Sequence, residues 1–230
     1  MSRVAILQSN YVPWKGTFDL IGSVDDFVVY DGVQFTKNDW RNRNRIKTPE
    51  GVQWLTIPVG ASIGRTIREV RIAGPGVGAL HWKRLQANYA RAACFDRERA
   101  WLEPHFVDAP WDSLSAVNRR LLEAVCQRLG IRTRFHDDSR LPAEGERTER
   151  LVAICRALGA TEYVSGPAAK AYLDESAFAA AGIAVRWFDY AGYPEYRQLW
   201  GPFAHDVSIL DLLFNLGDDA PGAMHRALWR

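Results

Sequence analysis

The residues best suited to chemistry follow the first short apolar run of the chain. Val4 to Leu7 is apolar, and the turn after it contains amide, aromatic and cationic side chains, namely Gln8, Asn10, Tyr11, Trp14 and Lys15. A strand-to-helix turn needs only residues such as Gly, Asp or Ser to reverse the chain and cap the helix. Because these side chains exceed that requirement, they indicate a ligand-binding site.

A second polar cluster is the segment FTKNDWRNRNRIK, which covers residues 35–47. Arginine and lysine bind phosphate and tryptophan stacks on flat rings, so this composition favours a phosphorylated ligand that carries a base. The candidate binding residues are Lys37, Asn38, Trp40, Arg41, Asn42 and Arg43. The alternation of Arg41, Arg43 and Arg45 also fits the charged face of an edge strand, which prevents sheet aggregation. Both interpretations stay open at this point.

Two later segments add candidates. In YVSGPAAKAYL, Ser165 and Gly166 stand at a strand-to-helix junction, where free backbone amides favour an anion, although Ser165 also fits a simple helix cap. The aromatic segment WFDYAGYPEYRQLWGPF, residues 187–203, can wall a pocket for a sugar or form a packed lid. From this segment we take Tyr190, Tyr196 and Gln198 as candidate binding residues.

Carboxylates are the candidate general bases. We predict Asp31 and Glu195 as catalytic residues, with Asp137, Asp138 and His136 as further candidates, although each of these residue types also serves as a surface or capping group. The five histidines are scattered along the chain, and no metal site is predicted.

The elements that position these residues follow from periodicity. Apolar runs alternate with helix-period segments, which predicts an α/β fold with a mainly parallel, doubly wound, Rossmann-like sheet. Predicted strands cover residues 4–7, 27–30, 54–59, 131–139, 162–166 and 183–190, and predicted helices cover 18–24, 80–95, 114–129, 149–158, 176–182 and 208–217. Ser208 is the expected cap of the last helix, with Asp211 in the capping-box position. We expect one domain over residues 1–230 with a helical lobe at 79–130; the segments 60–78 and 141–149 are boundary candidates.

Ligands of doubly wound sheets bind beyond the carboxyl ends of the strands. We therefore expect Gln8, Asn10, Asp31, Ser165 and Tyr190 to converge on one cleft. Composition limits the ligand class, because 29 basic and 27 acidic residues give a net charge of +2. Such a balance disfavours nucleic acid. Three separated cysteines and the absence of a signal core or membrane span lead us to expect a cytoplasmic protein. The oligomeric state is left open.

The chain resembles the WbqC-like protein family, a bacterial family associated with gene clusters for surface-polysaccharide sugars. The resemblance rests on LQSNYVPWKGTFDLI, FVVYDGVQFTKNDWRNRNRIKTPEGVQWLTIPV, LGATEYVSGPAAKAYLDESAF and YRQLWGPFAHDVSILDLLFNLG. It implies modification of an amino sugar by a small acyl or aminoacyl group such as glycine. The first strand-helix-strand unit is also distantly similar to nucleotidylyltransferases and pantothenate synthetase, except that Thr17 stands where those enzymes carry a histidine.

Three function classes remain. The first is a transferase that acylates an amino sugar on a nucleotide carrier, with Lys15, Lys37, Arg41 and Arg43 on phosphates and Asp31 or Glu195 accepting the amine proton. The second is a nucleotidyl or adenylyl transferase that activates a small acid with ATP. The third is a non-catalytic partner that binds a nucleotide sugar.

Overall fold

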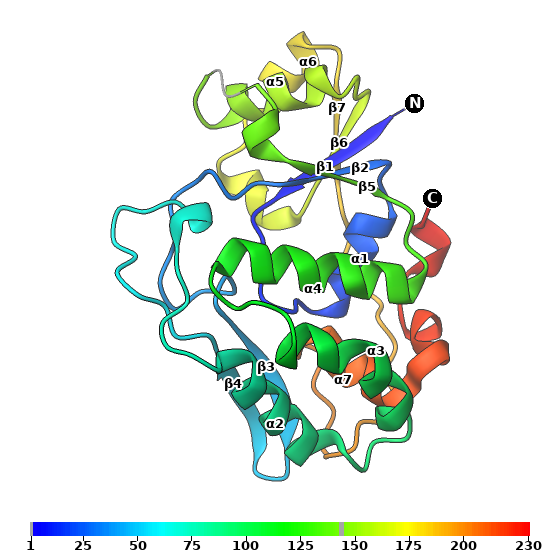
Figure 1. The fold of residues 1–230 in the computed structure, drawn as a ribbon. Coiled ribbons are helices and arrows are strands. Elements are labelled where there is room, and N and C mark those ends of the chain that lie inside the picture. The colour runs from blue at the N-terminus through cyan, green and yellow to red at the C-terminus, as the bar shows by residue number, and fades with distance from the viewer. Residues whose placement is uncertain (1, 143–144) are drawn as a thin grey trace.

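The fold is built around a parallel sheet. The computed structural model describes residues 2–142 and 145–230, so part of the boundary candidate 141–149 lies outside the described residues. The sheet has five strands in the order β5-β2-β1-β6-β7 (Figure 1). These are β1 (Arg3–Leu7), β2 (Asp26–Val29), β5 (Arg134–Asp137), β6 (Glu162–Ser165) and β7 (Ala184–Trp187). All four neighbouring pairs are parallel, as predicted.

The strand order reverses direction at β1. The chain runs from β1 outward to β2 and β5, and then returns to the other side of β1 to form β6 and β7. This arrangement is the doubly wound, Rossmann-like topology, in which the crevice between the diverging connections is the usual ligand site. In this protein that switch point lies at the carboxyl ends of β1 and β6.

The described residues form seven α-helices. They are α1 (Lys15–Gly22), α2 (Val77–Tyr89), α3 (Phe95–Val107), α4 (Leu114–Leu129), α5 (Thr148–Ala157), α6 (Glu175–Ala180) and α7 (Ile209–Leu216). Alternate residues of the strands face two separate cores, since side chains of a strand alternate between its faces. Ala5 and Phe27 pack on the side of α1 and α4, whereas Val4 and Val28 pack on the side of α5 and α6 (Figure 1).

Helix α4 forms as its periodicity predicts. Ser113 caps it by accepting a hydrogen bond from the Ala116 amide at 3.4 Å, and Gly130 ends it with a φ of 74°. The predicted single helix over 80–95 was wrong, because α2 stops at Tyr89 and a separate α3 follows from Phe95. Sequence periodicity missed α3 because its buried face includes Glu98, a fully buried carboxylate that accepts from Arg128 at 2.5 Å.

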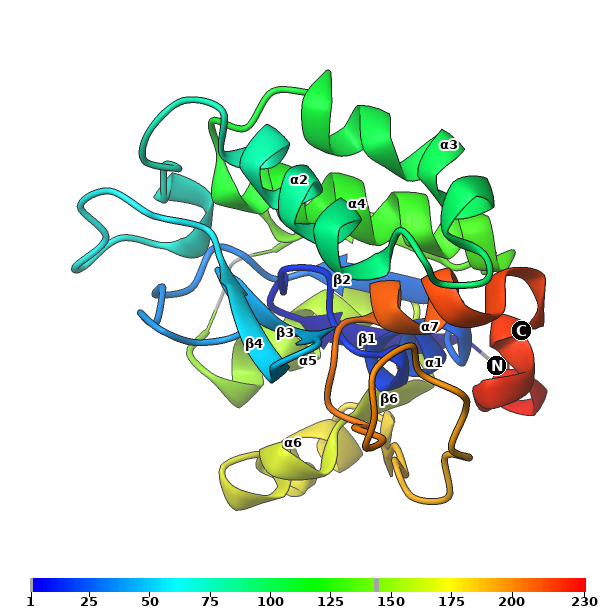
Figure 2. The ribbon, with the colours of Figure 1, turned by 90° about the horizontal axis from the view of Figure 1, so that it is seen from below.

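The basic segment runs into a hairpin. Strands β3 (Arg43–Thr48) and β4 (Gly51–Thr56) pair antiparallel, so the predicted strand at 54–59 begins earlier than expected. The hairpin is labelled in Figure 2, and it contacts α2, since Arg84 of that helix donates to Gln53 of β4 at 2.8 Å. Arg43 and Arg45 are half-buried while Asn44 and Ile46 are buried, which is the period of a strand with one face on the core.

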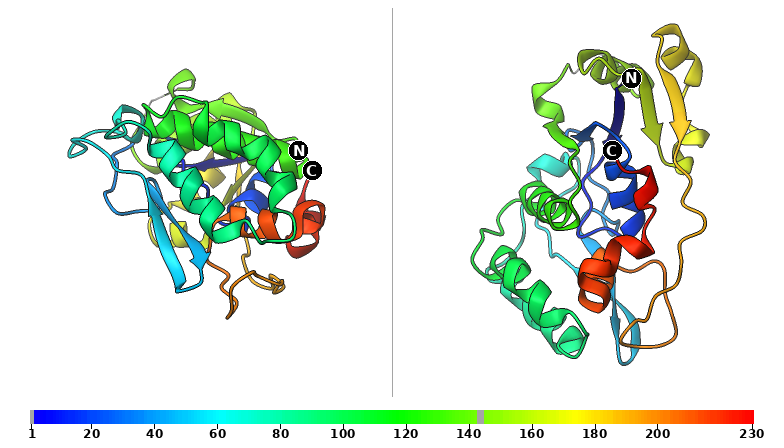
Figure 3. Two further views of the ribbon diagram at one scale, coloured as in Figure 1. Left: turned by 60° about the horizontal axis from the view of Figure 1, so that its bottom comes forward. Right: turned by 90° about the vertical axis from the view of Figure 1, so that its right-hand side faces the viewer.

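Two buried carboxylates, Asp211 and Asp19, form hydrogen bonds that hold the carboxyl-terminal part of the chain in place. Asp211 was predicted to cap its own helix, but only Ser208 does so. Asp211 is buried and instead accepts from the hydroxyls of Tyr89 at 2.9 Å and Tyr196 at 2.8 Å. Asp19 accepts from the Trp229 indole at 2.7 Å, which holds the end of the chain beside α1 (Figure 3).

The described helices include none that is both long enough and apolar enough to cross a membrane.

A buried tyrosine-histidine pair joins three elements. Tyr11, in the turn after β1, has its hydroxyl 2.7 Å from Nδ1 of His81 on α2. Nε2 of His81 lies 3.1 Å from the carbonyl oxygen of Thr56 at the end of β4. The carbonyl can only accept, so Nε2 carries the proton and the Tyr11 hydroxyl donates to Nδ1. The ring is therefore held neutral, and its burial lowers the pKa of His81 to about 4.

This pair predicts an acid-sensitive fold. Since the pKa of His81 is lower in the folded than in the unfolded chain, its contribution to stability is complete above pH 6.5 and is lost as pH falls toward 4. We expect the free energy of unfolding to fall between pH 7 and pH 5 by about 2 kcal/mol more in the wild type than in His81→Gln. Urea denaturation at the two pH values measures this difference. Equal pH dependence in both proteins would contradict the assignment.

Candidate functional site

A cavity of about 1150 Å³ opens at the switch point. Its lining comes from the end of β1, the basic segment, the start of α5 and the segment after β6. The polar and aromatic side chains that line it include Gln8, Asn10, Tyr30, Trp40, Arg41, Glu146, Arg147, Thr148, Arg150, Ser165 and Tyr172. The cavity therefore lies where doubly wound folds bind ligands.

Arg41 supplies a largely buried positive charge to this cavity. Its guanidinium donates to the side-chain oxygens of Gln8 and Asn10, which are both uncharged. The carboxylate of Asp39 forms a loose ion pair with this guanidinium, at 3.8 Å from Nη2, which is beyond hydrogen-bonding distance. Burial lowers the pKa of Arg41. A desolvated cation whose hydrogen bonds go to neutral groups is suited to binding an anionic ligand group.

The start of α5 adds two more arginines to the cavity lining. Arg147 and Arg150 lie at the first turn of α5 together with Thr148, and all three line the cavity. Nε of Arg150 is buried and has no hydrogen-bond partner in the described part of the chain. These residues were missed by the sequence analysis, which took the polar stretch 141–149 only as a boundary. The charged run ERTER before an apolar helix was the available signal.

Five predicted residues come together in the cavity, namely Gln8, Asn10, Trp40, Arg41 and Ser165. Asn118 on α4 holds two of their segments in place. Its amide nitrogen donates to the Ser9 hydroxyl at 3.2 Å and to the Arg41 carbonyl at 2.8 Å. The turn after β1 and the basic segment are thus fixed against the same helix.

Other predicted residues lie outside the cavity lining. Tyr11 and Asn42 are buried, and the Asn42 amide donates to the Ile57 carbonyl at 3.0 Å. The guanidinium of Arg43 stacks on Trp54, with its central carbon 4.1 Å from the ring centre. Lys37 and Asn38 are exposed in the loop before Trp40.

The aromatic segment 187–203 packs largely on α1. Lys15 donates to the Pro194 carbonyl at 3.2 Å and lies 5.1 Å from the Tyr196 ring centre. Burial lowers the pKa of Lys15 to about 8. Gln198 donates to the Ala204 carbonyl at 2.9 Å.

Two further residues of this segment take different positions. Tyr190 stacks on Trp14 at 5.3 Å between ring centres, beside Gly166, so it approaches the switch point without lining the cavity. Glu195 is exposed. The candidate roles of Lys15, Gln198 and Glu195 in binding or catalysis stay predictions.

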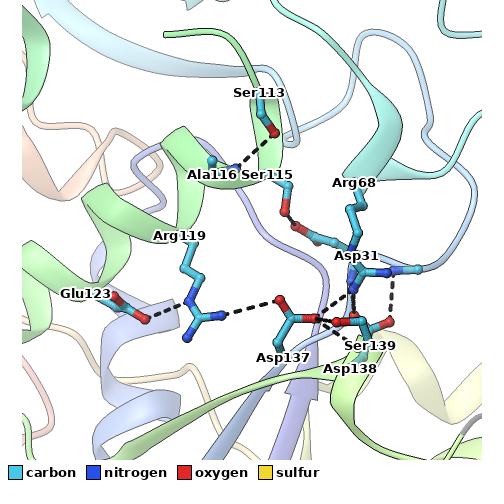
Figure 4. Close-up of polar contacts among 11 residues, drawn as sticks. Asp31, Arg68, Ser113, Ser115, Ala116, Arg119, Glu123, Asp137, Asp138 and Ser139 are labelled. Atoms are coloured by element: carbon cyan, nitrogen blue, oxygen red, sulfur yellow. Dashed lines mark hydrogen bonds and ion pairs between the residues drawn. The ribbon is translucent and has the colours of Figure 1, made fainter. Parts of the chain in front are cut away.

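Asp31 is buried and is not among the residues that line the cavity. Its carboxylate is 1% exposed and accepts from the Ser9 amide at 2.8 Å and from the Ser115 hydroxyl (Figure 4). Burial raises the pKa of Asp31. This geometry fixes the turn after β1, and a role of Asp31 as a base stays a prediction.

Ion pairs lie at the carboxyl end of β5 and at the amino end of β2. Arg68 pairs with Asp137 at 2.9 Å and also with Asp138 (Figure 4). Asp138 in addition accepts from the Gly32 amide at 2.9 Å. His136 pairs with Asp26 through Nε2 at 2.7 Å. These partners give Asp137, Asp138 and His136 structural roles on this half of the sheet.

The Asp31 contacts predict how two substitutions affect stability. In Asp31→Asn the amide oxygen still accepts from the Ser9 amide, and the Ser115 hydroxyl rotates to accept from the new NH₂ group. We expect this variant to lose no more than about 1 kcal/mol, whereas Asp31→Ala, which leaves buried donors unpaired, loses about 2–4 kcal/mol. Urea denaturation at pH 7 compares them. Equal losses would show that these hydrogen bonds do not stabilise the turn.

Comparison with known proteins identifies the family of the chain. The model of the WbqC-like protein family matches residues 8–222, which include the basic segment and the start of α5. A protein of Mycobacterium tuberculosis (strain ATCC 25618 / H37Rv), named Uncharacterized protein Rv1507c, is 51% identical over 223 residues, which are 96% of each chain. No solved structure matches the chain. The chain belongs to the WbqC-like protein family.

Proposed function

We propose that this protein is a biosynthetic transferase that binds a nucleotide-linked amino sugar in the switch-point cavity and attaches a small acyl or aminoacyl group, such as glycine, to its amine. The observation that carries the proposal is the guanidinium of Arg41, which is largely buried and held by two uncharged amides at the cavity floor. Such a group complements a phosphate better than it complements a neutral ligand.

The rest of the cavity supports a phosphorylated ligand with a flat ring. Arg147 and Arg150 line the same cavity as Arg41, so a diphosphate bound there can meet positive charge from two segments of the chain. Trp40 and Tyr172 line the cavity with side chains that are partly exposed, which leaves aromatic surface on which a nucleobase can stack.

The transfer step requires an activated acyl donor, such as a thioester or an acyl phosphate. The amine nitrogen of the sugar attacks the acyl carbon and forms the amide bond. The bond from that carbon to the leaving group breaks, and the leaving group takes the electron pair. The amine proton passes to a base, and Glu146 is the carboxylate among the described lining residues.

One assay separates this proposal from its alternatives. The protein is incubated with nucleotide sugars, activated acyl donors, glycine and ATP, and the products are analysed by mass spectrometry. Mass gain on the sugar supports the transferase. Pyrophosphate release supports an ATP-dependent nucleotidyl or adenylyl transferase, and binding without turnover supports a non-catalytic nucleotide-sugar partner.

Binding should depend on Arg41 and not on its neighbour in β3. Arg41→Ala removes a charge-assisted hydrogen bond to phosphate, so we expect nucleotide-sugar affinity to fall about 10- to 100-fold. Arg43→Ala is the matched control, because its guanidinium stacks on Trp54 outside the cavity, and it should change affinity less than about threefold. Calorimetry measures both. Equal losses in the two variants would contradict the assignment of Arg41.

Turnover should identify the base. Glu146→Gln keeps the size of the side chain and removes the proton acceptor, so we expect turnover to fall by about two to four orders of magnitude. Asp31→Asn should lower it less than about tenfold, because that carboxylate is buried and does not line the cavity. If Asp31→Asn instead causes the larger loss of turnover and leaves ligand affinity unchanged, Asp31 is the base.

A further inference from the structure

A second, smaller cavity adjoins the switch-point cavity. Its volume is about 260 Å³, and it shares Asn10 and Trp40 with the larger one. Its other lining residues are Pro13, Trp14, Thr17, Asn44 and Asp206. It is smaller than the roughly 300 Å³ at which cavities begin to hold drug-sized ligands, so it is too small for a nucleotide.

The aromatic wall of this cavity is held in position. The Trp14 indole packs directly over Gly16, where an added Cβ would lie 2.4 Å from the ring. The same indole packs at a tilt against Tyr190 and edge-on against Tyr193, with ring centres 5.3 Å and 5.6 Å away. Glycine at position 16 is therefore a steric requirement of this wall. The wall is formed before any ligand arrives.

The polar groups around this wall have unused hydrogen-bonding capacity. The Asn10 oxygen accepts from Arg41, but its NH₂ group makes no hydrogen bond within the described residues. One oxygen of Asp206 accepts from Arg45, which leaves the other without a partner there. Both N–H groups of the Asn44 side chain are occupied, since they donate to the carbonyls of Tyr11 and Val12 at 3.0 Å and 2.9 Å. The cavity thus offers the free NH₂ group of Asn10 as a donor and the free oxygen of Asp206 as an acceptor, beside two indoles.

We propose that this small cavity is the subsite for the sugar ring of the nucleotide-linked ligand, whose phosphates lie across Asn10 and Trp40 in the larger cavity. This inference rests on the proposed function. A sugar ring presents apolar CH faces that pack on indoles, and hydroxyls that need both donors and acceptors at its edge. The carboxylate of Asp206, paired with Arg45, disfavours a phosphate in the same space.

Thr17 provides a way to fill the cavity. It lies on α1, is 8% exposed, and its hydroxyl makes no hydrogen bond to another described residue. Thr17→Leu places extra carbon atoms in the cavity. Thr17→Val keeps the volume of threonine and serves as the matched control.

The experiment compares nucleotide sugars with the corresponding nucleoside diphosphates by calorimetry. The probes are UDP-N-acetylglucosamine, dTDP-glucose and GDP-mannose against UDP, dTDP and GDP. In the wild type and Thr17→Val we expect at least one sugar-bearing ligand to bind about tenfold more tightly than its diphosphate. In Thr17→Leu that difference should disappear, while diphosphate affinity stays within about twofold.

Each other outcome has a defined meaning. A Thr17→Leu variant that keeps the sugar preference, or that weakens the diphosphate equally, overturns the subsite. If no nucleotide binds the wild type, the proposed function fails, and saturation-transfer NMR with free N-acetylglucosamine tests the subsite separately. If the sugar shows saturation transfer with the wild type and Thr17→Val but not with Thr17→Leu, the result supports the subsite. Any other pattern overturns it.

Discussion

The contact on which the site depends is the one between Arg41 and the turn after β1. A single guanidinium donates to Gln8 and Asn10, so a residue of the basic segment and the end of the central strand occupy fixed relative positions. Both cavities use this junction, because Asn10 and Trp40 line each of them. Arg41 thereby sets the electrostatic character of the larger cavity and the wall of the smaller one.

Such a junction needs rigid support, since a buried polar turn is stable only when its donors and acceptors are paired. The support comes from three directions. Asp31 accepts from the Ser9 amide, Asn118 donates to Ser9 and to the Arg41 carbonyl, and Asn44 donates to the carbonyls of Tyr11 and Val12. Val12 takes a positive φ of 34°, a strained value for a β-branched residue that the neighbouring contacts impose. The turn is thus organised before a ligand binds.

The sequence predicts those features of the fold and the site that depend on neighbouring residues, and it misses those that depend on distant parts of the chain. Strand ends are local signals, and Gln8, Asn10 and Ser165 line the switch-point cavity, whereas Asp31 and Tyr190, which were expected to converge with them, do not. The arginines of α5 were not predicted, because their position depends on the return of the chain from β5 across β1 to β6, which no local pattern encodes. The same limit applies to Asp211. Its spacing from Ser208 fits a capping box, but its carboxylate accepts hydrogen bonds from Tyr89 and Tyr196 instead.

The arginines show why net charge alone does not locate function. Arg68, Arg128 and Arg134 each lie within 3 Å of a carboxylate, so the charge of each is directly paired. Arg41 is largely buried, but its hydrogen bonds go to amides, and its ion pair with Asp39 is longer, at 3.8 Å. A buried charge that makes no hydrogen bond to a counter-ion lowers stability, and a bound anion at the switch point would offset that cost. The type of partner, rather than the number of basic residues, therefore distinguishes a ligand-binding arginine from a structural one in this protein.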